Sequence, residues 1–363
     1  MKKRALSLLS ALCLSLALLA GCGGEASPTA APPSGEGGAA QTFTDSTGRT
    51  VTLPERVERI AISGPLSQVY IIPLAGDMLV GVSNAFSSDA ELYLPRYITE
   101  APEIGQLYGG KAELDLEALL AAGPDVVIDI GETKDSTGED MERLSRQKGI
   151  PFVHVYATVD TAPTAYRTLG RLLGREEKGE ELARWCEDTL TAMDALMAEV
   201  DQAGARKNIL YCLGDDGVNV MAKGSFHADT INTMGNNLAV IDDVVPHGDG
   251  NETDVEQIML WDPEVILFDP ASIYDQVGEM AAWQNVGAIQ SGNYYKAPYG
   301  PYGWLSSPPA VQRYLGLLWL GELLYPDYAD YDLKEEVTEY YRLFYDCELT
   351  DDMYRDLTAG ALG

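Results

Sequence analysis

The sequence predicts an α/β protein of two similarly built lobes, each with a mostly parallel, doubly wound sheet, joined by one long α-helix. An internal repeat is the first reason: residues 115–128 (DLEALLAAGPDVVI) and 254–267 (DVEQIMLWDPEVIL) share Asp, Glu, Pro and Val at matching positions. Each copy reads as a helix that begins after an Asp, ends before a Pro and leads into an apolar strand. The second reason is that short apolar runs and helical patterns alternate on both sides of a long helical stretch. Two such lobes enclose a cleft.

The first lobe is expected to comprise residues 42–160. Its pattern predicts strands at 59–63, 79–83, 126–130 and 152–156, and helices at 116–122 and 141–148. Residues 161–204 carry no strand signal. Their apolar residues recur at helical spacing, with a break near 174–179, so this segment is expected to link the lobes.

The second lobe, residues 205–363, repeats the plan. Strands are expected at 208–213, 218–222, 265–269 and 294–298, and the lobe ends in helices at 309–324 and 333–345. This alternation again favours a parallel sheet covered by helices.

The first residues predict export and a lipid anchor. Lys2, Lys3 and Arg4 precede the apolar run 5–20, which is too short for a membrane span and suits a secretory signal peptide over residues 1–21. The run leads into LAGC, which resembles the lipobox of bacterial lipoproteins, with Cys22 as the acylated residue; an ordinary signal peptide with an incidental cysteine is the alternative. Residues 22–41, rich in Gly, Ala, Pro and Ser, are expected to form a disordered tether. The predicted location is the extracytoplasmic face of the cell membrane, lipid-anchored.

Charge and cysteine content exclude several function classes. The chain carries 56 acidic and 25 basic side chains, for a net charge of −31 at pH 7, which disfavours any nucleic-acid partner. Beyond the expected anchor, Cys186, Cys212 and Cys347 are an odd set without a CxxC motif, so no redox chemistry is assigned to them. Cys212 lies inside an apolar run and is expected to be buried.

Several motifs together resemble the substrate-binding lipoproteins of ABC importers for iron-siderophores, haem and cobalamin. They are the lipobox, the opening TFTDSTGR at 42–49, the strand RIAI at 59–62, the two repeated units and the long helix, and the similarity runs from Thr42 to the C-terminus. The resemblance implies two Rossmann-like lobes bridged by a rigid helix, with the ligand held between them. It also implies that the chain delivers a small-molecule metal chelate to a permease dimer and its ATPase subunits, and that the chain needs no cofactor of its own.

Ligand contacts are expected at the carboxyl ends of the strands, because ligands of doubly wound sheets lie there. The richest such segment is 299–304 (YGPYGW), where Gly303 would allow the indole of Trp304 to turn toward the cleft. The alternative is that these aromatic residues pack in the core. The expected ligand-binding residues are Gly64, Pro65, Leu66, Ser67, Tyr108, Gly131, Tyr156, Ser225, His227, Tyr274, Tyr299, Tyr302 and Trp304.

Neither a bare metal site nor an enzyme is favoured. Of the histidines, His154 is expected in the core, His227 near the cleft and His247 in an exposed loop, so they do not cluster as metal ligands. The chain has no HExxH, GxSxG or P-loop motif, and Ser225, His227 and Asp229 are too close in sequence for a triad, so no catalytic residue is expected. A membrane-anchored lipoprotein enzyme or a bare metal-ion binder in the same cleft remain the alternatives.

The ligand and the partner surface are the last expectations. Only Lys223 and Lys296 in the second lobe, and Arg96 and Lys111 in the first, come near the expected cleft, which favours a weakly charged chelate, a haem or a corrinoid over an anionic siderophore. The family resemblance implies docking through one glutamate per lobe. By position in the repeat these are Glu117 and Glu256, which also suit the first turn of a helix without any partner.

Overall fold

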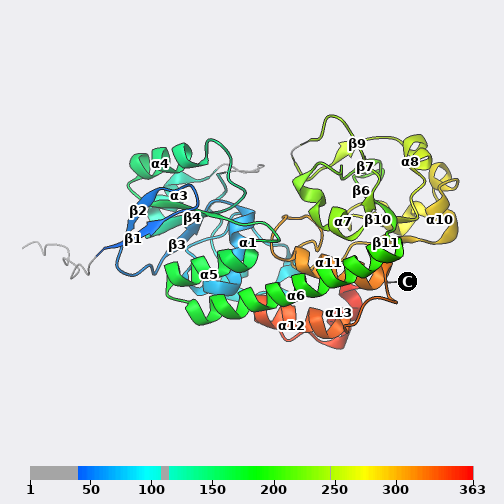
Figure 1. Ribbon diagram of the computed structural model, residues 1–363. Coiled ribbons are helices and arrows are strands. Elements are labelled where there is room, and N and C mark those ends of the chain that lie inside the picture. Colours follow the sequence, from blue (N-terminus) through cyan, green and yellow to red (C-terminus); the bar gives the residue numbers. More distant parts are fainter. Residues whose placement is uncertain (1–39, 108–113, 246, 363) are drawn as a thin grey trace, which may run out of the picture. The chain divides into compact units, whose positions relative to one another are not determined.

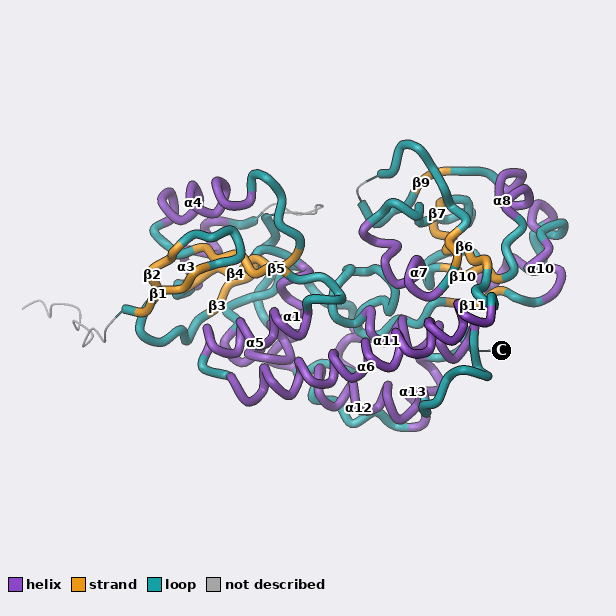
Figure 2. Tube along the Cα trace, viewed as in Figure 1, coloured by secondary structure: helices purple, strands orange, loops and turns teal. Residues whose placement is uncertain are grey.

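The computed structural model describes residues 40–107, 114–245 and 247–362. Its strands fall into two parallel-type sheets and one small hairpin (Figures 1 and 2). The predicted α/β class, with two lobes and one long connecting helix, is confirmed.

The first lobe is built on a parallel sheet with the order β3-β4-β5. All six residues of β4 are buried because both faces of the sheet are covered. Leu119 of α3 and Met141 of α4 pack on one face, and Val69 of α1 packs on the other. The elements of this lobe are β1 (Gln41–Thr44), β2 (Thr50–Leu53), β3 (Ile60–Ile62), α1 (Pro65–Ala75), η1 (Gly76–Met78), η2 (Ser88–Leu92), α2 (Arg96–Thr99), α3 (Leu116–Ala122), β4 (Val126–Gly131), α4 (Thr137–Lys148) and β5 (Phe152–Tyr156).

An antiparallel hairpin of β1 and β2, which the sequence patterns did not predict as strands, is attached to β5. In its turn, Asp45 Oδ1 accepts hydrogen bonds from the backbone N–H groups of Thr47 (3.0 Å) and Arg49 (3.1 Å). Arg49 Nη2 in turn donates to the carbonyl of Phe152 at 3.0 Å. The TFTDSTGR motif is therefore a structural turn that fixes the hairpin to the sheet.

Two helices link the lobes, α5 (Ala162–Leu173) and α6 (Glu176–Ala203). They are separated at Gly174, whose φ of 64° ends α5 in the predicted break region. The 28 residues of α6 correspond to a length of about 42 Å. Figure 1 shows α6 extending from α5 to α11, and both helices pack against it.

The second lobe has a sheet with the order β11-β10-β6-β7-β9, with β8 also paired to β6. The β10–β11, β10–β6 and β6–β8 pairs are parallel, whereas β7 pairs antiparallel with both of its neighbours. The elements are β6 (Asn208–Leu213), β7 (Asn219–Val220), η3 (Phe226–Ala228), α7 (Asp229–Met234), β8 (Asn236–Asn237), β9 (Asn251–Glu252), α8 (Val255–Trp261), β10 (Val265–Phe268), α9 (Tyr274–Val277), η4 (Ala281–Trp283), α10 (Gly287–Ser291), β11 (Tyr294–Lys296), α11 (Arg313–Leu324), α12 (Leu333–Tyr345) and α13 (Asp351–Leu357).

The repeated unit is structurally the same in both lobes. Asp115 caps α3 by accepting hydrogen bonds from two backbone N–H groups, and Asp254 caps α8 by accepting one. Both helices end in a left-handed residue, Gly123 at φ 56° and Asp262 at φ 49°. From residue 114 to 124 the sequence of buried and exposed positions is identical to that from 253 to 263. The repeat therefore presents the same helix face in each lobe.

Several predicted elements differ from the structure. The helix expected at 141–148 begins four residues earlier, at Thr137, and the strand expected at 294–298 ends at Lys296. Residues 79–83 form only isolated bridges, Ile60 with Leu79 and Val82 with Glu103, because the segment pairs first with β3 and then with the loop at 102–104. The expected strand at 218–222 is reduced to β7. The expected helix at 309–324 begins only at Arg313, because prolines occupy positions 308 and 309.

One continuous cluster of buried apolar residues runs from β3 and α1 through α5, α6, α11 and α12 to β6. Tyr340 and Phe344 of α12 stack in parallel with 4.2 Å between ring centroids, and Trp185 of α6 packs edge-on against both rings. Because this core spans elements of both lobes, they share a single packed base.

Candidate functional site

The carboxyl edge of the first sheet brings together four of the predicted site residues. Gly131 ends β4 and lies opposite Tyr156 in the parallel register. A Cβ at Gly131 would lie 3.3 Å from Leu66 Cδ2, so a glycine here leaves room for the start of α1. Pro65 and Leu66 are half-buried, and Tyr156 is 40% exposed. These residues form one accessible edge.

Ser67, however, does not line a site, which corrects the expectation for this residue. Its side chain is buried, and its Oγ accepts a hydrogen bond from the N–H of Ile130 at 2.9 Å and lies 3.0 Å from Ser63 Oγ. Gly64 before it is also buried and caps α1 in an extended conformation. The serine is used to fasten α1 to β4.

Below this edge lies a buried polar network centred on Asp129 and His154. Ser63 Oγ donates to Asp129 Oδ1, while Asp129 Oδ2 lies 2.6 Å from His154 Nδ1. His154 Nε2 is 2.9 Å from Thr133 Oγ1, so both ring nitrogens have partners. His154 is fully buried, which confirms the prediction that it is a core residue. The network stiffens the carboxyl ends of β4 and β5.

In the second lobe, Ser225 and His227 stand at the start of η3. Ser225 is buried and caps the helix by accepting a hydrogen bond from the His227 N–H at 3.2 Å. The His227 ring is half-buried, with Nδ1 3.3 Å from the carbonyl oxygen of Ser306. Burial lowers the pKa of His227 below its ordinary value, against the opposing effect of that carbonyl. This shift favours the neutral form of the imidazole.

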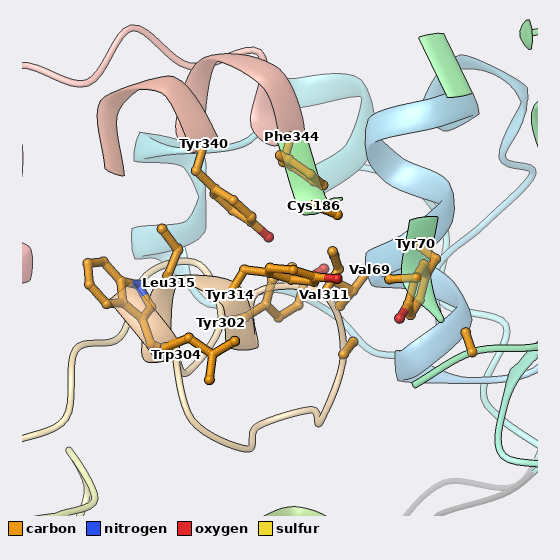
Figure 3. Close-up of a cluster of buried hydrophobic side chains, with 14 of the residues drawn as sticks. Val69, Tyr70, Cys186, Tyr302, Trp304, Val311, Tyr314, Leu315, Tyr340 and Phe344 are labelled. Carbon is orange, nitrogen blue, oxygen red and sulfur yellow. The ribbon is translucent and has the colours of Figure 1, made fainter. Parts of the chain in front are cut away.

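The aromatic segment 299–304 differs from the expectation in a specific way. Tyr299 is 51% exposed, but Tyr302 is buried and its hydroxyl oxygen accepts a hydrogen bond from Gln68 Nε2 at 3.0 Å. Trp304 is completely buried (0% exposed), among the side chains that Figure 3 shows. The expected orientation of the indole toward a cleft is thus wrong, because its large apolar surface is packed in the shared core. Tyr299 remains as the accessible aromatic residue of this segment.

The ring of Tyr274 packs against β11, the edge strand of the second sheet. Its ring is 5.7 Å from that of Tyr294, and Lys296 Nζ lies 5.7 Å above its centroid. A Cβ at Gly360 would contact it, so the C-terminal segment covers this ring.

Two of the four basic residues expected near the cleft form ion pairs with acidic side chains. Arg96 is paired with Glu100 on the surface of α2, and Lys296 with Asp275 at 3.0 Å. Lys223 is exposed. Lys111 and the predicted site residue Tyr108 lie outside the described residues, as does Cys22.

Two residues at the junction of the lobes were missed by the sequence patterns. Gln68 of α1 links the lobes, because its Oε1 accepts from the N–H of Ser83 (2.8 Å) while its Nε2 donates to Tyr302. Arg313, the first residue of α11, is buried with 1% of its side chain exposed and pairs with Asp229 at 3.2 Å. A buried glutamine or arginine carries no sequence signal, since these residues are usually exposed.

The described part of the chain contains no group of three or more His, Cys, Asp or Glu side chains arranged to hold a metal ion. Cys186, Cys212 and Cys347 are free and buried, so the prediction for Cys212 is confirmed. None of the described helices is both long enough and apolar enough to cross a membrane.

Comparison with known proteins identifies the class. A family model described as periplasmic binding protein matches residues 73–299. An ABC transporter solute-binding protein from Sulfurospirillum deleyianum is similar in structure, with a TM-score of 0.78 and 29% identity over 87% of this chain and 98% of that one. A periplasmic solute-binding protein from Veillonella parvula has a TM-score of 0.68 and 26% identity over 89% and 98% of the two chains.

More distant likeness extends to structures whose ligands are known. The molybdate-binding protein MolA of Haemophilus influenzae, in complex with molybdate, has a TM-score of 0.63 and 19% identity, covering 85% of this chain and 99% of that one. At this identity the likeness shows the fold alone. A comparison with curated protein sequences gives no match. Because the family model covers more than half of the sequence, the chain belongs to the periplasmic binding protein family and is a substrate-binding component of an ABC transporter.

Proposed function

We propose that this protein is a lipid-anchored, extracytoplasmic binding protein that captures a metal chelate and delivers it to an ABC importer. The chelate is an iron-siderophore, a haem or a corrinoid. In this proposal residues 42–160 and 205–363 form the two ligand-binding lobes, and residues 161–204 form the link between them.

The observation that carries the proposal is an exposed tyrosine beyond the carboxyl ends of the parallel strands in each sheet. Tyr156 ends β5 and is 40% exposed; Tyr299 follows β11 and is 51% exposed. Ligands of such sheets lie beyond the carboxyl ends of the strands. A tyrosine offers a broad apolar face with one polar tip, which suits a large, partly aromatic chelate better than a bare ion.

The repeated helix supports docking to a two-subunit permease. Glu117 and Glu256 are exposed on the second position of α3 and α8, and Leu120 and Met259, one turn later, are 49% and 37% exposed. Each lobe therefore offers one carboxylate beside one apolar side chain. This arrangement is complementary to a permease surface that has two basic pockets, each with an apolar rim.

The proposed attachment places the lipid on Cys22. Residues 22–41 would separate the anchor from the lobes, so membrane attachment and ligand binding would be independent. The support for this attachment is the sequence motif that ends in Cys22.

The direct test is to purify the protein from its native host and identify the small molecule that it carries. Mass spectrometry and an absorbance scan for porphyrin, corrin and charge-transfer bands would identify the ligand. The proposal expects one chelate per chain, recovered chemically unchanged after incubation. A bare metal ion, or conversion of the molecule to a product, would contradict it and favour the metal-ion binder or the enzyme.

A further inference from the structure

The repeated unit has the same backbone arrangement in both lobes, so its positions can be compared one by one. β4 follows α3 and pairs in parallel with β3, while β10 follows α8 and pairs in parallel with β6. The residue before β4 or β10 is acidic and accepts a hydrogen bond at 2.9 Å from the start of the neighbouring strand. Asp125 accepts from the N–H of Arg59, and Glu264 accepts from the N–H of Asn208. Arg59 and Asn208 are therefore equivalent positions.

The charged group at the carboxyl end of the repeated helix differs between the lobes. In the first lobe, Arg59 donates to two carbonyls at the end of α3, one of them that of Gly123 at 3.0 Å, so an exposed guanidinium lies there. In the second lobe the counterpart of Arg59 is the neutral Asn208. The counterpart of Gly123 is Asp262, an exposed residue that ends α8. The helix end therefore carries a cation in the first lobe and a carboxylate in the second.

The residues one position earlier reverse this difference in sign. Glu58 precedes Arg59, whereas Lys207 precedes Asn208 and pairs with Glu264 at 3.0 Å. Over the four matching positions, 58, 59, 123 and 125 or 207, 208, 262 and 264, each lobe has two carboxylates and one cation. The two helix ends thus differ in where the charges lie and not in net charge, which makes the difference one of surface pattern.

The exposed apolar side chains on the two helices also differ in size. Leu120 and Met259 occupy matching positions and are both exposed. The next residue is Ala121 in α3 but Leu260 in α8, and Leu260 is 79% exposed. A single exposed leucine is ordinary, but beside Met259 it makes the apolar part of the second helix larger. We call these two surfaces the docking faces, formed by Arg59, Glu117, Leu120 and Ala121 in the first lobe and by Glu256, Met259, Leu260 and Asp262 in the second.

We infer that the two docking faces bind two non-identical permease surfaces, so that this chain docks on its importer in one orientation. This inference rests on the docking part of the proposed function. A permease of two identical subunits presents the same surface twice because of its two-fold symmetry. A surface complementary to Arg59 and Ala121 offers an acidic group and little depth. Turned to the second lobe, it would place that acidic group opposite Asp262 and would leave no room for Leu260.

Like charges that meet across an interface exclude the wrong partner and fix the orientation of the right one. The partner is therefore a permease with two different subunits, or with two different halves in one chain. One of its surfaces offers a basic pocket, a shallow apolar rim and an acidic group to the first lobe. The other offers a basic pocket, a deeper apolar rim and a second basic group to the second lobe.

Photo-crosslinking identifies the surface that each docking face touches. Purified Ala121→Cys and Leu260→Cys variants are labelled with a benzophenone maleimide and irradiated on membranes of the native host, and the cross-linked peptides are identified by mass spectrometry. All variants carry Cys22→Ala, and the free cysteines of the lobes are buried and should stay unlabelled. Ala192→Cys, at an exposed alanine of α6, is the control. We expect the labels at positions 121 and 260 to reach two different permease sequences and the control to reach neither.

Exchanging the two apolar side chains tests the orientation independently. Affinity is measured by titrating the chain onto the importer, purified from the native host and held in lipid nanodiscs. Leu260→Ala should weaken docking about tenfold, because most of a leucine side chain is no longer buried in the interface. The double variant Ala121→Leu, Leu260→Ala should bind no better than Leu260→Ala, because the larger side chain then meets the shallower surface. Thermal unfolding should be the same in both variants as in the wild type, since both positions are exposed.

The outcomes separate this inference from the proposed function. If both labels reach the same permease peptide, or if the double variant binds as tightly as the wild type, the two permease surfaces are equivalent. The inference is then overturned while docking through the repeated helices stands. If the labels reach no permease sequence, or only a second copy of this chain, the docking part of the proposed function fails and the inference fails with it. Unchanged affinity in Leu260→Ala has the same meaning, because the second face then makes no apolar contact with the permease.

Discussion

Replacing Trp304 with alanine is expected to reduce the stability of the fold and to leave the ligand contacts in place. The indole is fully buried in the core that joins both lobes, within the cluster of side chains shown in Figure 3. Removing a buried tryptophan side chain costs about 3–5 kcal/mol, because apolar contacts are lost and a cavity remains. This is a large share of the roughly 5–15 kcal/mol by which folded proteins are stable. For a chain of this length it corresponds to a fall of roughly 4–7 °C in Tm.

The assay is urea unfolding followed by circular dichroism, together with titration of the ligand recovered from the native host. Trp304→Phe should lose less, about 1–2 kcal/mol, because most of the volume is kept. Tyr299→Ala is the control variant, for which the opposite pattern of effects on stability and ligand affinity is expected. Its ring is half-exposed, so the free energy of unfolding should change by only about 0.5 kcal/mol while ligand affinity falls. If Trp304→Ala unfolds like the wild type but loses affinity, the indole lies in the ligand site and the packing argument is refuted.

Three further predictions concern attachment, docking and pH. Cys22→Ala should move the protein from the membrane to the soluble fraction with ligand affinity unchanged; a variant that stays with the membrane would contradict the lipid anchor. Glu117→Gln and Glu256→Gln should each leave binding and Tm unchanged and reduce uptake of the ligand by cells, with the double variant lowest; normal uptake by the double variant would show that each residue only favours the helix dipole. Burial lowers the folded-state pKa of His227 below its ordinary value of about 6.5, so the unfolded chain binds more protons than the folded chain below that pH. The free energy of unfolding should therefore fall as the pH drops through this window. In urea titrations between pH 7.5 and 5, His227→Gln should show a shallower fall than the wild type. An equal slope in that variant would assign the effect to other groups.

Regular, strongly patterned segments could be predicted from the sequence. The strands at Phe152–Tyr156 and Asn208–Leu213 and the helices at Leu116–Ala122 and Leu333–Tyr345 have the predicted bounds. Each combines a clear apolar period with a start or stop signal, such as the Asp cap before α12. The hairpin of β1 and β2 carries a weaker signal, because each strand has only four residues and β1 contains a single apolar residue, Phe43.

The candidate site was harder to predict because burial depends on contacts that are distant in sequence. A Gly-Pro segment with aromatic residues can either contact a ligand or pack in the hydrophobic core. Only the burial of Trp304 in the shared core distinguishes these two roles. Ser67 was expected in the site from its place after β3, yet its hydroxyl bonds to β4. The burial of Arg313 could not be predicted, because its contacts with Phe226 and Asp229 are distant in sequence and its own segment has an ordinary helical pattern.

The most direct test of the central claim is uptake of the ligand identified from the purified protein. Cells that lack this chain should lose high-affinity accumulation of that metal chelate, and expression of the wild-type chain should restore it. Tyr299→Ala, which is expected to fold normally but bind weakly, should restore it only at higher ligand concentration. Uptake that is the same with and without the chain would contradict its role as the substrate-binding component of an importer for that ligand.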